Sequence, residues 1–135
     1  MKVVIDTNIF VSGIFWKGSP HQVLLAWRQG RYTLITSVDI LSEISKVLND
    51  FEIKLPKEMI NEWIELIIKN SIIVEPKEKI QAVKEDPKDD MFIEAAVTAK
   101  ADYVISGDKH LLKLKQFGDT KIISASQFNE ICNFI

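Results

Sequence analysis

The feature that most constrains the fold is the alternation of short apolar runs with longer segments of helical periodicity. The first run, Lys2–Ile5, is β-branched and ends abruptly at Asp6, which is typical of a strand buried on both faces. Further strands are predicted at Tyr32–Thr36, Ser71–Val74, Tyr103–Ser106 and Lys121–Ile123. Runs of this kind favour a parallel sheet rather than a half-exposed antiparallel one.

The intervening segments have apolar residues spaced three and four apart, which predicts helices. Ser19 and Pro20 predict a helix start, with Ser19 as N-cap and an end near Gln29, and Ser37 caps a second helix that includes Glu43. Other helices are predicted at Pro56–Lys69, Asp90–Ala99, a short segment through Leu111 and Leu112, and about Ser126–Cys132. Strands that alternate with helices imply βαβ units with right-handed crossovers and helices on both faces of the sheet.

Length and composition narrow the class of protein. A chain of 135 residues predicts one domain, residues 1–135, around a single core. No run is long and apolar enough for a membrane span, and the first residues do not resemble a signal peptide, so we expect a cytoplasmic protein without membrane contact. With a net charge of −2, any nucleic-acid partner must be attracted by local basic groups or by bound cations.

Acidic residues fall where the predicted strands end. Asp6 directly follows the first strand, and Asp108 follows the fourth across a single glycine. Asp90 opens the helix before the fourth strand, and Glu43 lies on the helix after the second. Because functional crevices of open α/β sheets lie outside the carboxyl ends of the strands, these four side chains are candidates for one site.

Carboxylates gathered in this way predict a divalent metal. Without a cation they would repel one another and raise their own pKa values. Oxygen ligands without histidine or thiolate suit magnesium or manganese. Such a site can activate water and stabilise the charge that develops when a phosphodiester is cut, which is nuclease chemistry.

Four segments together resemble the PIN-domain ribonucleases, especially toxins of the VapC type from toxin–antitoxin pairs. They extend over almost the whole chain and occur in the family's order and spacing. The segments are Val3-Val4-Ile5-Asp6-Thr7-Asn8, Leu41-Ser42-Glu43-Ile44, Asp86-Pro87-Lys88-Asp89-Asp90-Met91-Phe92-Ile93-Glu94-Ala95-Ala96, and Ala101-Asp102-Tyr103-Val104-Ile105-Ser106-Gly107-Asp108.

The resemblance implies a fold, a site and partners. The fold would be a three-layer α/β/α sandwich with a five-stranded parallel sheet. Mg²⁺ or Mn²⁺ would be held by Asp6, Glu43, Asp90 and Asp108, with Ser106 as a polar contact. The substrate would be RNA, and the chain would form homodimers and bind a small antitoxin. The family often has an acidic residue where this chain has His110, so a fifth acid is missing there.

Several roles stay open at this point. Asp89 could exchange roles with Asp90, whereas Asp86 is interpreted as a pre-proline turn residue. Glu94, one turn after Asp90, could approach the metal's water shell or face solvent. Thr7 and Asn8 could bond a carboxylate or phosphate, or merely satisfy the turn.

Two rival functions also remain. One is a phosphohydrolase that uses Asp6 as a nucleophile, although such enzymes usually have a second carboxylate where Asn8 stands and a committed lysine. The other is a catalytically silent binding module whose acids hold metal or salt bridges. Phosphate release from a small ester would indicate the first rival, RNA cleavage a nuclease, and neither activity the silent module.

Overall fold

A six-stranded sheet with the order β3-β2-β1-β4-β6-β5 forms the centre of the computed structural model, which describes residues 1–50 and 55–132. Neighbouring strands are parallel except for the antiparallel pair β5–β6. The strands are β1 (Lys2–Ile5), β2 (Thr33–Ser37), β3 (Ser71–Val74), β4 (Tyr103–Ile105), β5 (Gln116–Phe117) and β6 (Thr120–Ile123).

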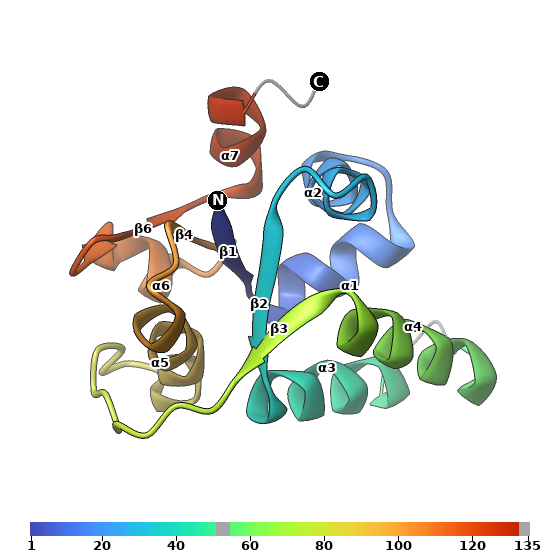
Figure 1. Cartoon of the computed structure of the whole chain (residues 1–135), viewed down its shortest axis with the longest axis horizontal. Helices are drawn as coiled ribbons and strands as arrows, with labels where there is room; N and C mark the ends of the chain where they lie inside the picture. Colours follow the sequence, from blue (N-terminus) through green and yellow to red (C-terminus); the bar gives the residue numbers. More distant parts are fainter. Residues whose placement is uncertain (51–54, 133–135) are drawn as a thin grey trace.

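Helices cover both faces of this sheet, as Figure 1 shows. Helices α1 to α4 lie on one side, α5 and α6 on the other, and α7 packs beside α2. Their bounds are α1 (Thr7–Phe15), α2 (Ser19–Arg28), α3 (Val38–Asp50), α4 (Lys57–Lys69), α5 (Asp90–Ala99), α6 (Lys109–Leu114) and α7 (Ala125–Cys132), and the 3-10 helix η1 spans Pro87–Asp89. The predicted α/β/α architecture is confirmed.

Apart from shifts of one residue in several bounds, three features differ from the sequence prediction. No helix was predicted before Ser19, yet α1 spans Thr7–Phe15. The sheet has a sixth strand, β5, which forms a hairpin with β6 through the turn at Gly118, whose φ of +56° favours glycine. In addition, Ser19 is the first residue of α2 and not its N-cap; Gly18 occupies that position without a side-chain hydrogen bond. The sixth strand and the start of α2 lie away from the site at the carboxyl ends of β1 and β4, whereas α1 begins there, directly after Asp6.

All residues of the central strands β1, β2 and β4 except the first of each are buried, which explains why β1 is so apolar. Val3 and Val4 of β1 are 0% exposed, as is Val104 of β4. Behind β1, Phe10 on α1 meets Trp27 and Trp63 edge-on, with ring centroids 5.8 and 6.1 Å away. A packed core on both faces holds β1 and β4 rigidly side by side.

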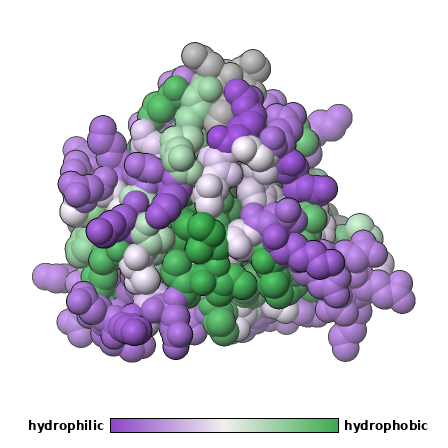
Figure 2. Space-filling view, in the orientation of Figure 1, coloured by the Kyte–Doolittle hydropathy of each residue, from purple (hydrophilic) through white to green (hydrophobic). Residues whose placement is uncertain are grey.

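The edge strand β3 is much less covered. Ile72 and Ile73 are 47% and 41% exposed, and Figure 2 shows apolar surface gathered over this strand in the middle of the face. Within residues 1–50 and 55–132, every helix is too short or too polar to cross a membrane.

Candidate active site

Asp6 lies at the point where β1 ends and α1 begins. Its backbone N–H donates to the Ile105 carbonyl of β4 at 3.0 Å, so the sheet itself holds the residue in place. The side chain is the N-cap of α1, where Oδ1 accepts the Ile9 N–H at 2.8 Å. Although it is a carboxylate, Asp6 is only 3% exposed.

The neighbouring strand β4 contributes Ser106 and Asp108. The Ser106 hydroxyl, which is 0% exposed, donates a hydrogen bond to Oδ2 of Asp6 and accepts the Asp108 N–H at 2.9 Å. Asp108 in turn caps α6 by accepting the His110 N–H at 2.7 Å. One serine therefore joins the two strand ends, as the resemblance implied for a polar residue at this position.

The opposite wall comes from the turn before α5. Asp86 is the N-cap of the 3-10 helix η1 and Asp89 is its last residue, and the Asp89 N–H donates to the Asp86 carbonyl at 3.0 Å. In a 3-10 helix, side chains three residues apart lie above one another. Carboxylate oxygens of Asp86, Asp89 and Asp108 consequently lie within 4.8 Å of one another.

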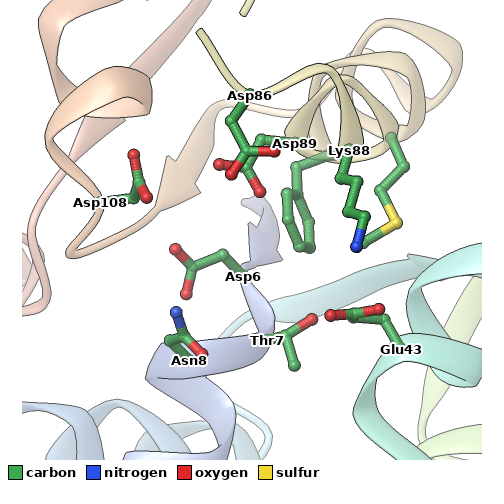
Figure 3. Close-up of a pocket in the computed structure, with 10 residues that line it drawn as sticks. Asp6, Thr7, Asn8, Glu43, Asp86, Lys88, Asp89 and Asp108 are labelled. Carbon is green, nitrogen blue, oxygen red and sulfur yellow. The ribbon is translucent and has the colours of Figure 1, made fainter. Parts of the chain in front are cut away.

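These walls enclose a polar cavity of about 250 Å³. Figure 3 shows the carboxylates of Asp6, Asp86, Asp89 and Asp108 converging on it. Pockets for organic ligands typically have roughly 300–1,000 Å³ and apolar linings. A small cavity lined by carboxylates suits a hydrated cation and one phosphate group better than an organic cofactor.

Burial and mutual repulsion perturb two of the carboxyl groups. Burial raises the pKa of Asp6 to about 6, and the nearby Asp108 adds to this effect, while the hydrogen bond from Ser106 opposes it. Burial also raises the pKa of Asp89 to about 7, with further contributions from Asp86, Asp108, Asp6 and Asp90. The pocket thus concentrates carboxylates that repel one another.

Similarity to known proteins identifies the family of this chain. The family model of the PIN domain matches residues 2–110, which include all of the pocket's acids. This chain belongs to the PIN-domain family. The PIN domain is also 35% identical over 122 residues to the uncharacterized protein MJ1680 of Methanocaldococcus jannaschii, covering 85% of this chain and 76% of that protein.

Solved structures share the fold of this PIN domain at low sequence identity. VapBC-1 from nontypeable Haemophilus influenzae aligns with a TM-score of 0.64 and 18% identity, covering 93% of this chain and 99% of the other. VapBC2 from Rickettsia felis, bound to a DNA fragment from its promoter, aligns with a TM-score of 0.60 and 16% identity, covering 90% and 97%. The predicted PIN-like fold is confirmed.

Of the four acids predicted as ligands, the structure brings Asp6, Glu43 and Asp108 to the pocket of this PIN domain. Glu43 lines the pocket from α3, apart from the other acids and next to Thr7 (Figure 3). Asn8 also lines it and is exposed. The Thr7 hydroxyl is buried there without a hydrogen-bond partner in the described part of the chain.

The structure does not bring Asp90 to the pocket. Its Oδ1 accepts the N–H groups of Ala82 and Val83 at 3.0 and 2.7 Å, so it faces the loop between β3 and η1. Glu94 does not approach the pocket either, because its Oε2 accepts the Ile80 N–H at 2.9 Å. Both side chains accept hydrogen bonds from backbone N–H groups of the loop. Nothing in the loop sequence predicted these contacts.

Three lining residues of the PIN domain were missed or ranked low from sequence. Asp86 was interpreted as a turn residue, and Asp89 was only the alternative to Asp90. The available signal was the pattern Asp-Pro-x-Asp: proline favours the first turn of a helix, and a 3-10 turn aligns residues three apart. Lys88, exposed at the rim, was not considered at all.

Proposed function

We propose that this PIN domain is an endoribonuclease that depends on Mg²⁺ or Mn²⁺ and acts as the toxin of a toxin–antitoxin pair. The observation that supports it best is the group of three carboxylates, Asp86, Asp89 and Asp108, whose oxygens lie within 4.8 Å of one another beside the buried Asp6. Family membership supports nuclease chemistry, and the cavity's size supports a small charged group.

The donor set fits a hard divalent cation. All of its ligand atoms are carboxylate oxygens, the preference of Mg²⁺ and Mn²⁺. Burial is the main cause of the raised pKa of Asp89, at about 7, and repulsion from the neighbouring carboxylates adds to it, a repulsion that a cation would relieve. When bound there, a divalent ion would polarise the phosphate and make water a better nucleophile at neutral pH.

The residues around the donor set have distinct roles in this proposal. Asp86, Asp89 and Asp108 hold the cation, and Asp6 adds charge from beneath, kept in one orientation by Ser106 and the Ile9 N–H. Lys88, at the rim, contacts an RNA phosphate. Glu43 and Asn8 orient water or substrate on the side of the pocket nearest α3 and α1.

The geometry also argues against Asp6 as a covalent nucleophile. Both of its oxygens accept hydrogen bonds, and the side chain is 3% exposed. A nucleophile needs a free oxygen that can reach phosphorus in line. An electrostatic role for Asp6 fits this burial better than the phosphohydrolase mechanism does.

The proposal extends to partners and location. We propose an antitoxin partner because the solved structures with this fold include VapBC assemblies. A homodimer would bury apolar surface such as that on β3, where Ile72 and Ile73 are exposed. Light scattering of the purified chain would measure its oligomeric state directly. Cytoplasmic localisation stays a prediction.

The test is cleavage of labelled total RNA by the purified chain with Mg²⁺, with Mn²⁺ and with EDTA, alongside a chromogenic phosphate ester. We expect metal-dependent RNA fragments and no ester hydrolysis. The variant Asp108→Asn should be inactive, and Asp119→Asn, which changes an exposed aspartate outside the pocket, should remain active. Equal activity of the Asp108 and Asp119 variants would refute the assignment of the site.

A further inference from the structure

Two carboxylates on α5 hold the irregular loop between β3 and η1. Asp90 accepts the N–H groups of Ala82 and Val83, and Glu94, one turn further along the helix, accepts that of Ile80. Hydrogen bonds to a charged acceptor are among the stronger ones in proteins. The loop has no regular secondary structure of its own, so these bonds take the place of a sheet or helix.

The anchored loop leads directly to the pocket. Val83, which is 1% exposed, donates its N–H to Asp90 at 2.7 Å, and its carbonyl accepts the Asp86 N–H at 3.3 Å. The Asp86 carbonyl then accepts the Asp89 N–H at 3.0 Å. A continuous hydrogen-bonded path therefore runs from the Asp90 carboxylate through Val83 to the two aspartates of the loop wall.

We infer that Asp90 is a positioning residue that orients Asp86 and Asp89 by fixing the backbone at Val83, with Glu94 as a second, more remote anchor. This inference rests on the proposed metal site and assigns a role to a residue beside it. Asp90 follows Asp89 directly, yet it does not line the pocket, and one of its oxygens already accepts two N–H bonds.

The variants Asp90→Asn and Asp90→Ala distinguish a positioning role of Asp90 from a role as a metal ligand. Asn retains a carbonyl oxygen that can accept the two N–H bonds, whereas Ala removes the acceptor. A metal ligand would lose its function in both variants because the negative charge is gone. A positioning residue would be rescued largely by Asn and not by Ala.

The first measurement is amide hydrogen exchange by NMR in EDTA, which needs neither metal nor activity. In Asp90→Ala, exchange at Ala82 and Val83 should accelerate by at least about tenfold, the effect of losing one hydrogen bond to a charged group. Asp90→Asn should change it much less. Glu94→Ala is the matched control on the same helix, and it should accelerate exchange at Ile80 while leaving Val83 close to wild type. Unchanged exchange at Val83 in Asp90→Ala would overturn the anchoring role.

The second measurement is calorimetric titration of the same variants with Mn²⁺, together with Asp89→Asn as a ligand variant. Asp90→Ala should weaken Mn²⁺ binding roughly 10- to 100-fold, as the loss of groups that orient metal ligands does, and Asp90→Asn only a few-fold. If Asp90→Asn weakened Mn²⁺ binding as much as Asp89→Asn does, Asp90 would be a ligand and the inference would be overturned. Faster exchange with unchanged Mn²⁺ affinity would overturn it too.

The two measurements also distinguish this inference from the proposed function. If Asp89→Asn and Asp108→Asn bind Mn²⁺ as tightly as the wild-type chain, the metal site itself is refuted, and with it the positioning role. The exchange data would then still show whether Asp90 anchors the loop.

Discussion

The two walls of the pocket are built in different ways. The strand-end wall, Asp6, Ser106 and Asp108, continues directly from the buried strands β1 and β4. The loop wall, Asp86 and Asp89, sits on a 3-10 turn after an irregular loop. In the first wall the sheet register places the side chains, and in the second, carboxylates of α5 hold the backbone.

This difference shows where the pocket is rigid and where it can adjust. The strand-end wall is held by the packing of a buried core, whereas the loop wall depends on a few partly buried hydrogen bonds. We therefore expect that a higher metal concentration does not restore the activity lost when Asp6 in the strand-end wall is substituted. Substitutions in the loop wall should be partly compensated by more metal.

The largest expected effect is the difference in RNA cleavage between Asp6→Asn and Asp86→Asn. Asp6→Asn should reduce RNA cleavage by roughly 1,000-fold at any Mg²⁺ concentration, because a preorganised buried charge is lost. Asp86→Asn should reduce it by about tenfold at low Mg²⁺, and raising Mg²⁺ should restore much of the rate by mass action. Cleavage rates measured across a Mg²⁺ series test both.

Thermal melting provides the control for this comparison. Asp6→Asn removes a repelling, buried charge, so it should fold with equal or greater stability. If Asp6→Asn were rescued by Mg²⁺ and Asp86→Asn were not, the assignment of the rigid and adjustable walls would be reversed.

The same contrast explains what could be predicted from sequence. Lys2–Ile5 and Tyr103–Ser106 are apolar runs that end in acids, so they predicted the strand-end wall and the positions of Asp6 and Asp108. The loop wall was harder to predict because Asp89 and Asp90 are adjacent at a helix start, where helical periodicity cannot show which one faces a pocket. The answer depends on the N–H groups of Ala82 and Val83, a tertiary contact.

The two edge strands of the sheet also differ in how well the sequence predicts them. Strand β5 has only the residues Gln116 and Phe117, too few for an apolar pattern to be recognised. Its one sequence signal is the two-residue Gly118-Asp119 turn, which is typical of a hairpin. The longer strand β3, by contrast, has the predicted bounds, Ser71–Val74.

The next effect concerns stability without metal as a function of pH. The pKa of Asp6 is raised to about 6 from 3.8, so the folded chain holds this proton more tightly than the unfolded chain. Stability should therefore fall as pH rises from about 4 to about 6, by roughly 3 kcal/mol from Asp6. Asp89, whose pKa is about 7, should extend the loss toward neutral pH, with a smaller contribution because it is partly exposed.

Urea unfolding in EDTA between pH 4.5 and pH 8 measures this dependence. Asp6→Asn should lack the Asp6 part of the loss, and added Mn²⁺ should restore stability at pH 8 by binding the folded chain. An identical pH profile in wild type and Asp6→Asn would show that burial does not perturb this carboxyl group as described.

The smallest effect tests the hydroxyl that joins the two strands of the rigid wall. Ser106→Ala removes the donor to Asp6 and the acceptor of the Asp108 N–H, so it should lower the free energy of unfolding by about 1–2 kcal/mol. Because the Ser106 bond lowers the pKa of Asp6, its loss should also move the pH-dependent drop in stability to higher pH. Ser106→Cys keeps the shape of the side chain with a weaker donor, so its free energy of unfolding should lie between those of wild type and Ser106→Ala. A stable Ser106→Ala chain with an unshifted pH profile would mean that backbone register alone positions Asp6, and that the serine adds nothing to the wall's rigidity.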